Sequence, residues 1–225
     1  MNPAWPFGEL KPHSYDLIMA DPPWETALHS AKGYKKSPES HYNTMSIEEI
    51  AALPLHRLAS KDCILFLWGR WDMLFEGMFN RRDPSQPPRP SFSPIGRVIE
   101  GFGFVACTGG AWVKQTKNGK LTMGTGYRVR GSTEPWFICT LGAPATSKGS
   151  RNCILTEELI AEIEQDNAIG ALRRKHSQKP PDAYEWCERY FPTAMRRLDL
   201  FSRETQQGWD AWGDQTGLLD QHGGA

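Results

Sequence analysis

Short apolar runs alternate along this chain with polar, proline-rich and glycine-rich segments. The runs have the length of β-strands, and the first is mostly apolar, as expected for a parallel strand covered on both faces. The predicted strands cover residues 15–20, 62–68, 102–113, 135–141 and 195–201.

Two helices are predicted between the strands. Ser46 is placed as an N-cap, and acidic residues fill the first turn behind it. Residues 181–190 predict a second helix with proline at its start. This helix should pack Tyr184 inward together with Trp186 or Cys187.

Asp21-Pro22-Pro23-Trp24 follows the first predicted strand and is the most informative stretch of the chain. Neither proline can donate to a strand ladder, so the strand stops at the end of the sheet where open α/β folds bind ligands. The Asp21 carboxylate and the Pro22 carbonyl could both accept hydrogen bonds from one amine. The Trp24 ring could stack on a planar base. A Pro-Pro turn with a core tryptophan is the alternative interpretation.

Asp-Pro-Pro-Trp is the catalytic motif of amino-group methyltransferases, and further segments make the chain resemble the MT-A70 family of adenine-N6 methyltransferases. The likeness runs in order through most of residues 6–215. The further segments are His41-Tyr42-Asn43-Thr44-Met45-Ser46, Leu65-Phe66-Leu67-Trp68, Ala111-Trp112-Val113-Lys114, Gly124-Thr125-Gly126-Tyr127-Arg128-Val129-Arg130, Lys175-His176-Ser177-Gln178-Lys179-Pro180, Leu198-Asp199-Leu200-Phe201-Ser202-Arg203 and Gly208-Trp209-Asp210-Ala211-Trp212-Gly213-Asp214-Gln215.

The resemblance implies an α/β protein with a Rossmann-like methyltransferase fold. Its sheet would be seven-stranded and mostly parallel with helices on both faces, in the permuted order that puts the catalytic motif before the cofactor strand. We expect a single domain over residues 1–219 and a flexible tail at 220–225. Compared with the family pattern, residues 80–94 form an inserted Pro/Arg-rich loop and residues 152–168 an added helix. The loop is either a plain surface loop or a basic flap that touches the substrate backbone.

The resemblance also implies S-adenosylmethionine as the cofactor. Lys179 would meet its methionine carboxylate, and Asp21 would lie near both its amine and the target amine. The remaining residues expected to contact the cofactor are Phe7, Phe201, Arg203, Asp214 and Gln215. The family usually has asparagine where this chain has Asp214, which can accept from ribose hydroxyls but cannot donate. A surface ion pair is the alternative for Arg203 and Asp214.

A base inside a duplex cannot reach such a pocket, so the target base is expected to be unpaired or flipped out. Trp24 would stack on it, and further substrate contacts would come from the pocket rim and a basic cluster. The candidates are Tyr42, Tyr127, Arg128, Arg130, Arg174, Lys175 and His176. Ordinary strand-edge charge is the alternative for Arg128 and Arg130.

We expect adenine-N6 methylation of DNA, because the small neutral chain resembles compact bacterial or phage members of the family. The same chemistry on RNA is one alternative. Another is a non-catalytic subunit that presents nucleic acid, although such subunits lose the acid or the tryptophan of the motif and this chain keeps both. Methylation of a small-molecule or protein amine is a further alternative.

Composition narrows the classes of protein to which this chain can belong. The 225 residues carry 26 basic and 26 acidic side chains, which argues against a protein that coats nucleic acid electrostatically but does not exclude a local basic groove. No apolar run approaches the ~20 residues of a membrane helix, and the N-terminus lacks a signal pattern. The five cysteines suit a reducing cytoplasm, with Cys63, Cys107 and Cys139 predicted as core thiols. The histidines show no metal-ligand spacing, and a homodimer or a partner subunit would fit so small a chain.

Overall fold

The computed structural model describes residues 5–25, 43–74, 93–114, 120–121, 129–147, 153–154, 179–218 and 220. Their strands form one seven-stranded sheet in the order β5-β3-β4-β2-β1-β6-β7. Strand β4 runs antiparallel to both of its neighbours, and the other described strand pairs are parallel, so the mostly parallel sheet is confirmed. The strands are β1 (Tyr15–Ala20), β2 (Ala59–Trp68), β3 (Val105–Val113), β4 (Thr133–Leu141), β5 (Cys153–Ile154), β6 (Arg197–Leu200) and β7 (Trp209–Trp212).

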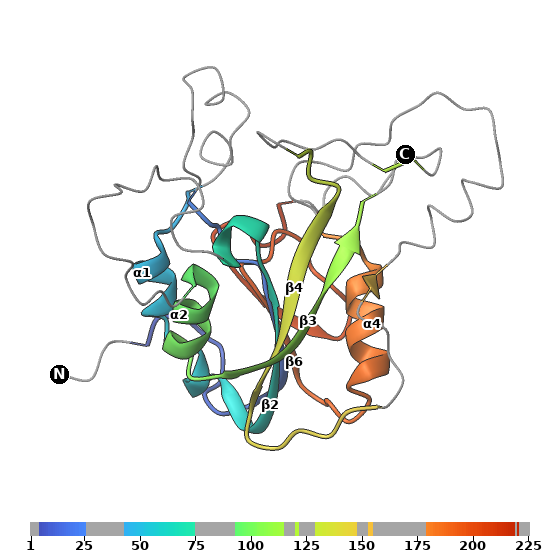
Figure 1. The fold of residues 1–225 in the computed structure, drawn as a ribbon. Coiled ribbons are helices and arrows are strands. Elements are labelled where there is room, and N and C mark those ends of the chain that lie inside the picture. Colours follow the sequence, from blue (N-terminus) through green and yellow to red (C-terminus); the bar gives the residue numbers. More distant parts are fainter. Residues whose placement is uncertain are drawn as a thin grey trace.

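Helices lie on both faces of this sheet, as predicted (Figure 1). Helices α1 (Ile47–Ala51) and α2 (Pro94–Gly101) cover one face, and α4 (Asp182–Tyr190) covers the other. Two short 3₁₀ helices, η3 (Leu55–Arg57) and η4 (Trp71–Leu74), stand before and after β2. This layered arrangement is the Rossmann-like methyltransferase fold. No helix among the described residues is long and apolar enough to cross a membrane.

The alternation of side chains along β1 divides the core in two. Ile18 and Ala20 point into a cluster that contains Ile50 of α1 and Val98 of α2. Met19 points the other way, into a second cluster beneath α4. Each fully buried aliphatic side chain contributes about 1.5–3 kcal/mol relative to exposure. A run of apolar residues without alternation is therefore what a strand covered on both faces requires.

The register of the strands brings their carboxyl ends to one edge. Ala20 of β1 is aligned with Leu67 of β2 on one side and Leu200 of β6 on the other, and Leu200 is aligned with Trp212 of β7. The residues that follow these positions therefore form a row along this edge. Because β4 is antiparallel to β2, its amino end, which begins at Thr133, lies at the same edge.

The sequence patterns missed α2 and β7. Ser93 and Pro94, assigned to the inserted loop, open α2: Ser93 Oγ accepts a hydrogen bond from the Gly96 N–H at 3.2 Å, and Pro94 occupies the first turn, where its missing N–H costs nothing. Phe102, predicted to begin a strand, is the C-cap of this helix, so β3 starts later, at Val105. Residues 80–92 of the predicted loop lie outside the described residues.

One smaller prediction needs correction. Cys107 is exposed, because among the described residues β5 pairs only with the carboxyl-terminal part of β3. Cys63 and Cys139 are buried as predicted. In the segment expected to be an added helix, Cys153 and Ile154 form β5, and the rest of that segment lies outside the described residues. Asp220, assigned to the flexible tail, accepts hydrogen bonds from the backbone N–H and the hydroxyl of Thr205, both at 2.8 Å.

Candidate active site

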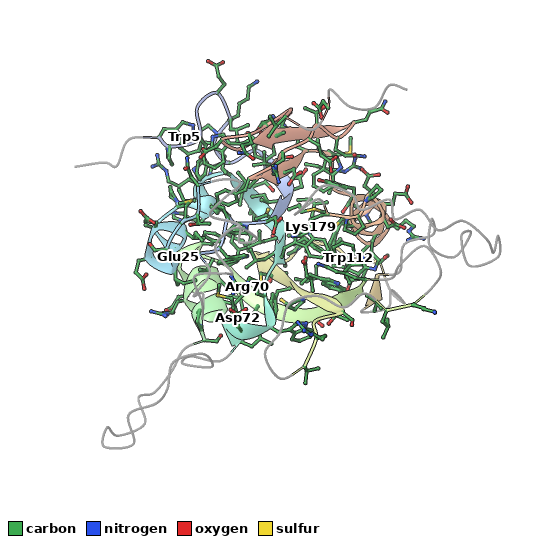
Figure 2. All side chains as sticks on the ribbon, turned by 90° about the horizontal axis from the view of Figure 1, so that it is seen from above. Trp5, Glu25, Arg70, Asp72, Trp112 and Lys179 are labelled. Carbon is green, nitrogen blue, oxygen red and sulfur yellow. The ribbon has the colours of Figure 1, made fainter. Side chains whose placement is uncertain are left out.

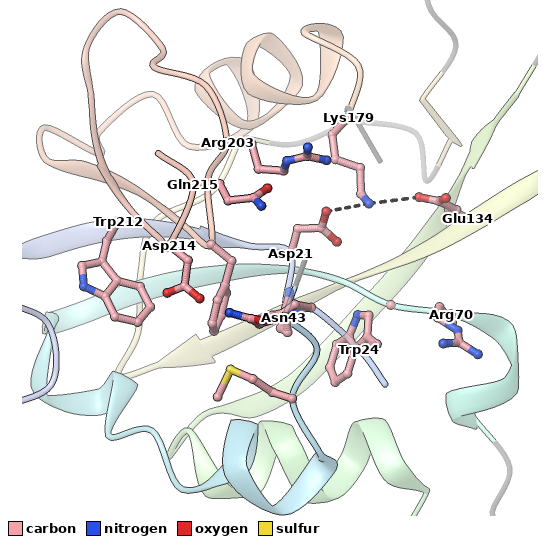
Figure 3. A pocket seen from close by; sticks show the side chains of 15 residues that line it. Asp21, Trp24, Asn43, Arg70, Glu134, Lys179, Arg203, Trp212, Asp214 and Gln215 are labelled. Carbon is pink, nitrogen blue, oxygen red and sulfur yellow. Dashed lines mark ion pairs between the residues drawn. The ribbon is translucent and has the colours of Figure 1, made fainter. Parts of the chain in front are cut away.

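A cavity of about 260 Å³ opens at the carboxyl edge of the sheet, above β1 and β6 (Figure 3). Its walls combine two carboxylates and a lysine at one end with aromatic, amide and guanidinium groups at the other. The lining residues are Asp21, Pro22, Pro23, Trp24, Asn43, Met45, Gly69, Arg70, Glu134, Lys179, Phe201, Arg203, Trp212, Asp214 and Gln215.

The Asp-Pro-Pro-Trp segment is held in place by backbone hydrogen bonds. The Pro22 carbonyl accepts the Trp24 N–H at 2.8 Å, which closes a tight turn directly after β1. The Pro23 carbonyl accepts the Met45 N–H at 2.8 Å, and Trp24 and Met45 form an isolated parallel bridge. A carbonyl oxygen has two lone pairs, so Pro22 keeps one acceptor site besides its turn contact.

Trp24 belongs both to the hydrophobic core and to the cavity wall. Its side chain is 5% exposed and belongs to the core cluster beneath α1 and α2, yet its remaining surface lines the cavity. The indole Nε1 is buried and donates to no atom among the described residues. A large flat base in the cavity would therefore meet a ring that the core already holds still.

Charged groups alternate along the cavity wall from Asp21 toward β3. Lys179 Nζ lies 2.8 Å from Asp21 Oδ2 and 3.3 Å from Glu134 Oε2, as the dashed lines in Figure 3 show. Glu134 is also paired with Lys114. The Lys179 ammonium sits 5.2 Å from the centre of the Trp68 ring, which adds a cation–π contact.

Burial and these neighbouring charges determine the ionisation of Asp21, Glu134 and Lys179. Burial raises the pKa of Asp21 above its ordinary value, and the Lys179 ammonium opposes that rise without cancelling it. Burial also penalises the charged form of Glu134, but Lys179 and Lys114 outweigh it and lower the pKa of Glu134 to about 2. Burial would favour a neutral Lys179, yet the two carboxylates raise the pKa of this ammonium. Lys179 therefore stays charged between them.

The opposite wall is built from the ends of β6 and β7. Phe201 adopts the left-handed region at φ 65°, which is uncommon for a bulky residue and turns the chain sharply after β6. Gly213 permits the close approach of the two segments, because a Cβ there would lie 2.9 Å from the Ser202 carbonyl oxygen. The rings of Phe201 and Trp212 meet edge to face with centroids 5.6 Å apart.

A second, smaller polar cavity of about 40 Å³ adjoins the first behind Asp21 and Lys179. It contains Asp199, which is 5% exposed and accepts a hydrogen bond from the Tyr184 hydroxyl at 2.7 Å. Burial raises the pKa of Asp199 to about 7, although the Tyr184 contact works in the other direction. A second titratable carboxyl group thus lies next to the cavity that Asp21 faces.

Nine of the predicted site residues share the main cavity: Asp21, Pro22, Pro23, Trp24, Lys179, Phe201, Arg203, Asp214 and Gln215. Phe7 does not line it; the side chain is 1% exposed and supports Trp212 from behind at a centroid distance of 5.3 Å. Arg130 is exposed and does not line it either. The predicted contacts that lie outside the described residues are Tyr42, Tyr127, Arg128, Arg174, Lys175 and His176.

Sequence reasoning missed six residues of the cavity wall: Asn43, Met45, Gly69, Arg70, Glu134 and Trp212. Asn43, Met45 and Trp212 belong to segments that carried the family resemblance without being assigned a role. Glu134 had a weaker signal, an acid at the boundary of a predicted strand. Only the antiparallel direction of β4 reveals that this end of the strand lies beside Asp21.

Comparison with known proteins matches the MT-A70 family model to residues 15–79 and 96–215. The chain is 26% identical over 92% of its length to the type II methyltransferase M.MunI of Mycoplasma sp, of which it spans 80%. It is 27% identical over 93% of its length to the mouse N(6)-adenine-specific methyltransferase METTL4, of which it spans 39%. It is 23% identical over 89% of its length to the N6-methyladenosine RNA methyltransferase MTA1 of Pyricularia oryzae, of which it spans 46%.

Proposed function

The chain belongs to the MT-A70 family, and from this premise we propose that it transfers a methyl group from S-adenosylmethionine to the N6 amine of an unpaired adenine in DNA. The observation that carries the proposal is the position of Asp21. Its carboxylate lies at the carboxyl end of a central strand, faces the cavity, is paired with Lys179 and stands beside the Trp24 ring.

The donor set of the cavity fits this cofactor. Arg203, Asp214 and Gln215 offer the guanidinium, carboxylate and amide groups that ribose hydroxyls require. Phe201 and Trp212 supply apolar surface beside them. Lys179 uses its ammonium group for two carboxylates and retains a third N–H donor for the methionine carboxylate.

Asp21 and Pro22 orient the target amine in this proposal. When bound, S-adenosylmethionine supplies a methyl group on a positively charged sulfur. Asp21 accepts one N6–H, and the remaining lone pair of the Pro22 carbonyl accepts the other. These contacts favour a nitrogen lone pair that points out of the ring plane, and they strengthen as positive charge develops on the nitrogen.

The proton balance requires no strong base. N6 gains the methyl group and loses one proton, and this proton can leave after transfer because the methylated amine is then cationic. Asp21 is an acceptor for it, and its raised pKa makes it a better one than an ordinary aspartate. Alignment of the two reactants within one cavity supplies much of the remaining rate.

DNA is the polymer we put first, in line with the resemblance to bacterial and phage members of the family. RNA is the second candidate, supported by the relative whose name specifies RNA. A non-catalytic role is disfavoured because all four residues of the motif are present and line one cavity.

Methyl transfer from labelled S-adenosylmethionine tests the proposal. The substrates are single- and double-stranded DNA and RNA oligonucleotides of matched sequence, each with an adenine-free control, and the enzyme is compared with Asp21→Ala. Adenine-dependent labelling of DNA that disappears in the variant is the expected result. Labelling of RNA alone would transfer the proposal to RNA. Retained labelling by Asp21→Ala, or none with any adenine-containing polymer, would overturn it.

A further inference from the structure

An exposed tryptophan stands directly beside the cavity. Trp71 opens η4, one residue after the wall residue Arg70 and two after Gly69. Its side chain is 45% exposed, and among the described residues it is the one aromatic side chain in the group of exposed large hydrophobics. The other members of that group are Val105, Leu121, Val129, Met195 and Leu218. A single exposed hydrophobic side chain is ordinary on a protein surface, but Trp71 differs from the others because it directly follows two residues of the cavity wall.

The Trp71 ring is held in a fixed position. Its Nε1 donates to the hydroxyl of Thr133 at 2.9 Å and lies 3.2 Å from the carbonyl oxygen of the same residue. Thr133 is the first residue of β4, and its neighbour Glu134 forms part of the cavity wall. The polar edge of the indole is therefore turned toward the protein, and nearly half of its surface is left to solvent.

The segment before Trp71 is tied to the catalytic motif. Arg70 pairs with Asp72, with Nε 2.9 Å from Oδ1, and its Nη1 donates to the Glu25 carbonyl at 3.2 Å, directly after Trp24. Seen from above, Arg70 and Asp72 lie close together, and Glu25 lies between them and Trp5 (Figure 2). Figure 3 places Arg70 at the Trp24 end of the cavity, opposite the wall that contains Trp212 and Asp214.

This arrangement gives the cavity mouth two aromatic planes with different exposure. Trp24 is almost wholly buried and lines the cavity, while Trp71 is exposed and directly follows the wall residue Arg70. When an unpaired adenine enters at the Trp24 end, its covalently linked neighbour must lie at the mouth. Every base has a π-face, so an immobilised indole there binds a neighbouring base with little regard to its identity.

We propose that Trp71 stacks on a nucleotide base flanking the target adenine and so holds the substrate strand across the cavity mouth. This inference rests on the proposed function, since it takes the substrate to be a single strand that contains adenine. It assigns Trp71 to substrate binding and leaves the methyl-transfer step to the residues inside the cavity.

Steady-state kinetics and binding with a labelled single-stranded DNA of one adenine test this role. Trp71→Ala is expected to raise KM and the dissociation constant about tenfold, the loss of one stacked base, while kcat changes less than about twofold. Trp71→Phe should retain most of the affinity, and Trp71→Leu should lose it while keeping apolar packing against η4. Met195→Ala, which removes another exposed hydrophobic, should change neither constant.

Oligonucleotides with an abasic site next to the adenine provide the decisive comparison. Removal of the stacked base should weaken binding by the wild type about as much as Trp71→Ala does, and should weaken binding by the variant no further. Equal effects of Trp71→Ala on intact and abasic strands, or an unchanged dissociation constant, would overturn the inference. Binding that depends on Trp71 without any methyl transfer would instead sink the proposed function and leave this inference standing.

Discussion

One aspartate lies near the amino end of β1 and another directly follows its carboxyl end, and their surroundings differ. At the amino end, Asp16 Oδ2 accepts the backbone N–H groups of Met195 and Arg196, each at 3.1 Å, and its Oδ1 accepts the Ser60 hydroxyl at 2.9 Å. These neutral donors tie β1 to the segment before β6 and to β2. Asp16 is therefore a structural residue.

At the carboxyl end, Asp21 has an ammonium partner on one oxygen, and its carboxylate faces the cavity. Burial holds its pKa above the ordinary range, which destabilises the ionised form that catalysis would use. The two aspartates at the ends of β1 therefore differ in role. An acid satisfied by fixed neutral donors holds the fold together, and an acid left facing a cavity is available to a substrate.

The largest predicted effect separates these two roles directly. Asp21→Ala should lower turnover about 10³-fold, because it removes the acceptor for the target amine. Its stability cost should be smaller than that of Glu134→Gln, because burial raises the pKa of Asp21 whereas the neighbouring lysines lower the pKa of Glu134. Asp16→Ala should leave two backbone N–H groups without their acceptor and lower the free energy of unfolding by about 2 kcal/mol, while the folded fraction keeps its turnover. Labelled methyl transfer and urea denaturation measure both quantities. A variant of Asp16 that loses turnover while remaining folded would break the distinction.

Asp199 should make stability depend on pH. Its folded-state pKa of about 7 lies above the unfolded value near 3.9, so the folded state binds more protons between these two values. The free energy of unfolding contributed by this group therefore falls as pH rises from about 4 to about 7, by as much as about 4 kcal/mol. Asp199→Asn keeps an acceptor for the Tyr184 hydroxyl and should remove this fall.

Denaturation at several pH values between 4.5 and 7.5 measures this difference. Asp210→Asn is the matched control, because Asp210 also accepts a tyrosine hydroxyl, that of Tyr15 at 2.7 Å, but its side chain is 52% exposed. The control keeps the Asp199 carboxyl group, so the fall in stability with rising pH should persist in it. If Asp199→Asn and the wild type show parallel profiles, the carboxyl group behind the cavity does not titrate in this range.

Glu134 provides a smaller test of the cavity wall. Glu134→Gln leaves Lys179 and Lys114 with one carboxylate fewer, and loss of this partner from a partly buried group should cost about 1.5–3 kcal/mol of stability. Turnover should fall as well, because Lys179 is then drawn more strongly toward Asp21. Glu48→Gln breaks an exposed pair with Arg97 and should cost less than about 1 kcal/mol. Equal costs for the two variants would contradict the contrast between cavity and surface.

The parts of the fold that follow from local pattern were predictable. The apolar run of β1, the two prolines that end it and the Ser46 cap each act through neighbouring residues, so the sequence displays them. Helix α2 was hidden because it begins with a proline inside a proline-rich run, where Ser93 acts as a cap only once the helix exists. Its length of 8 residues also leaves little periodicity to detect.

The parts of the site that depend on strand direction were not predictable. Glu134 lies at the start of β4 and Trp71 follows the end of β2. Only the antiparallel pairing of these strands places Glu134 near Asp21 and brings Trp71 into contact with Thr133. Arg70 was overlooked because it belongs to no motif. It follows the buried strand β2 and the cavity residue Gly69. In contrast, Lys179 and Gln215 were identified through the family resemblance, which already encodes long-range neighbours.

The smallest predicted effect compares two helix caps. Ser46 and Ser93 each accept a backbone N–H at 3.2 Å, and replacement of either by alanine should cost about 1 kcal/mol. Only Ser46 follows Met45, which lines the cavity and is bonded to the Pro23 carbonyl. Ser46→Ala should therefore also raise KM, by about twofold to fivefold if a ~1 kcal/mol disturbance reaches the cavity, whereas Ser93→Ala should change stability alone. Equal KM values for the two variants would show that the catalytic turn is positioned by β1 without help from α1.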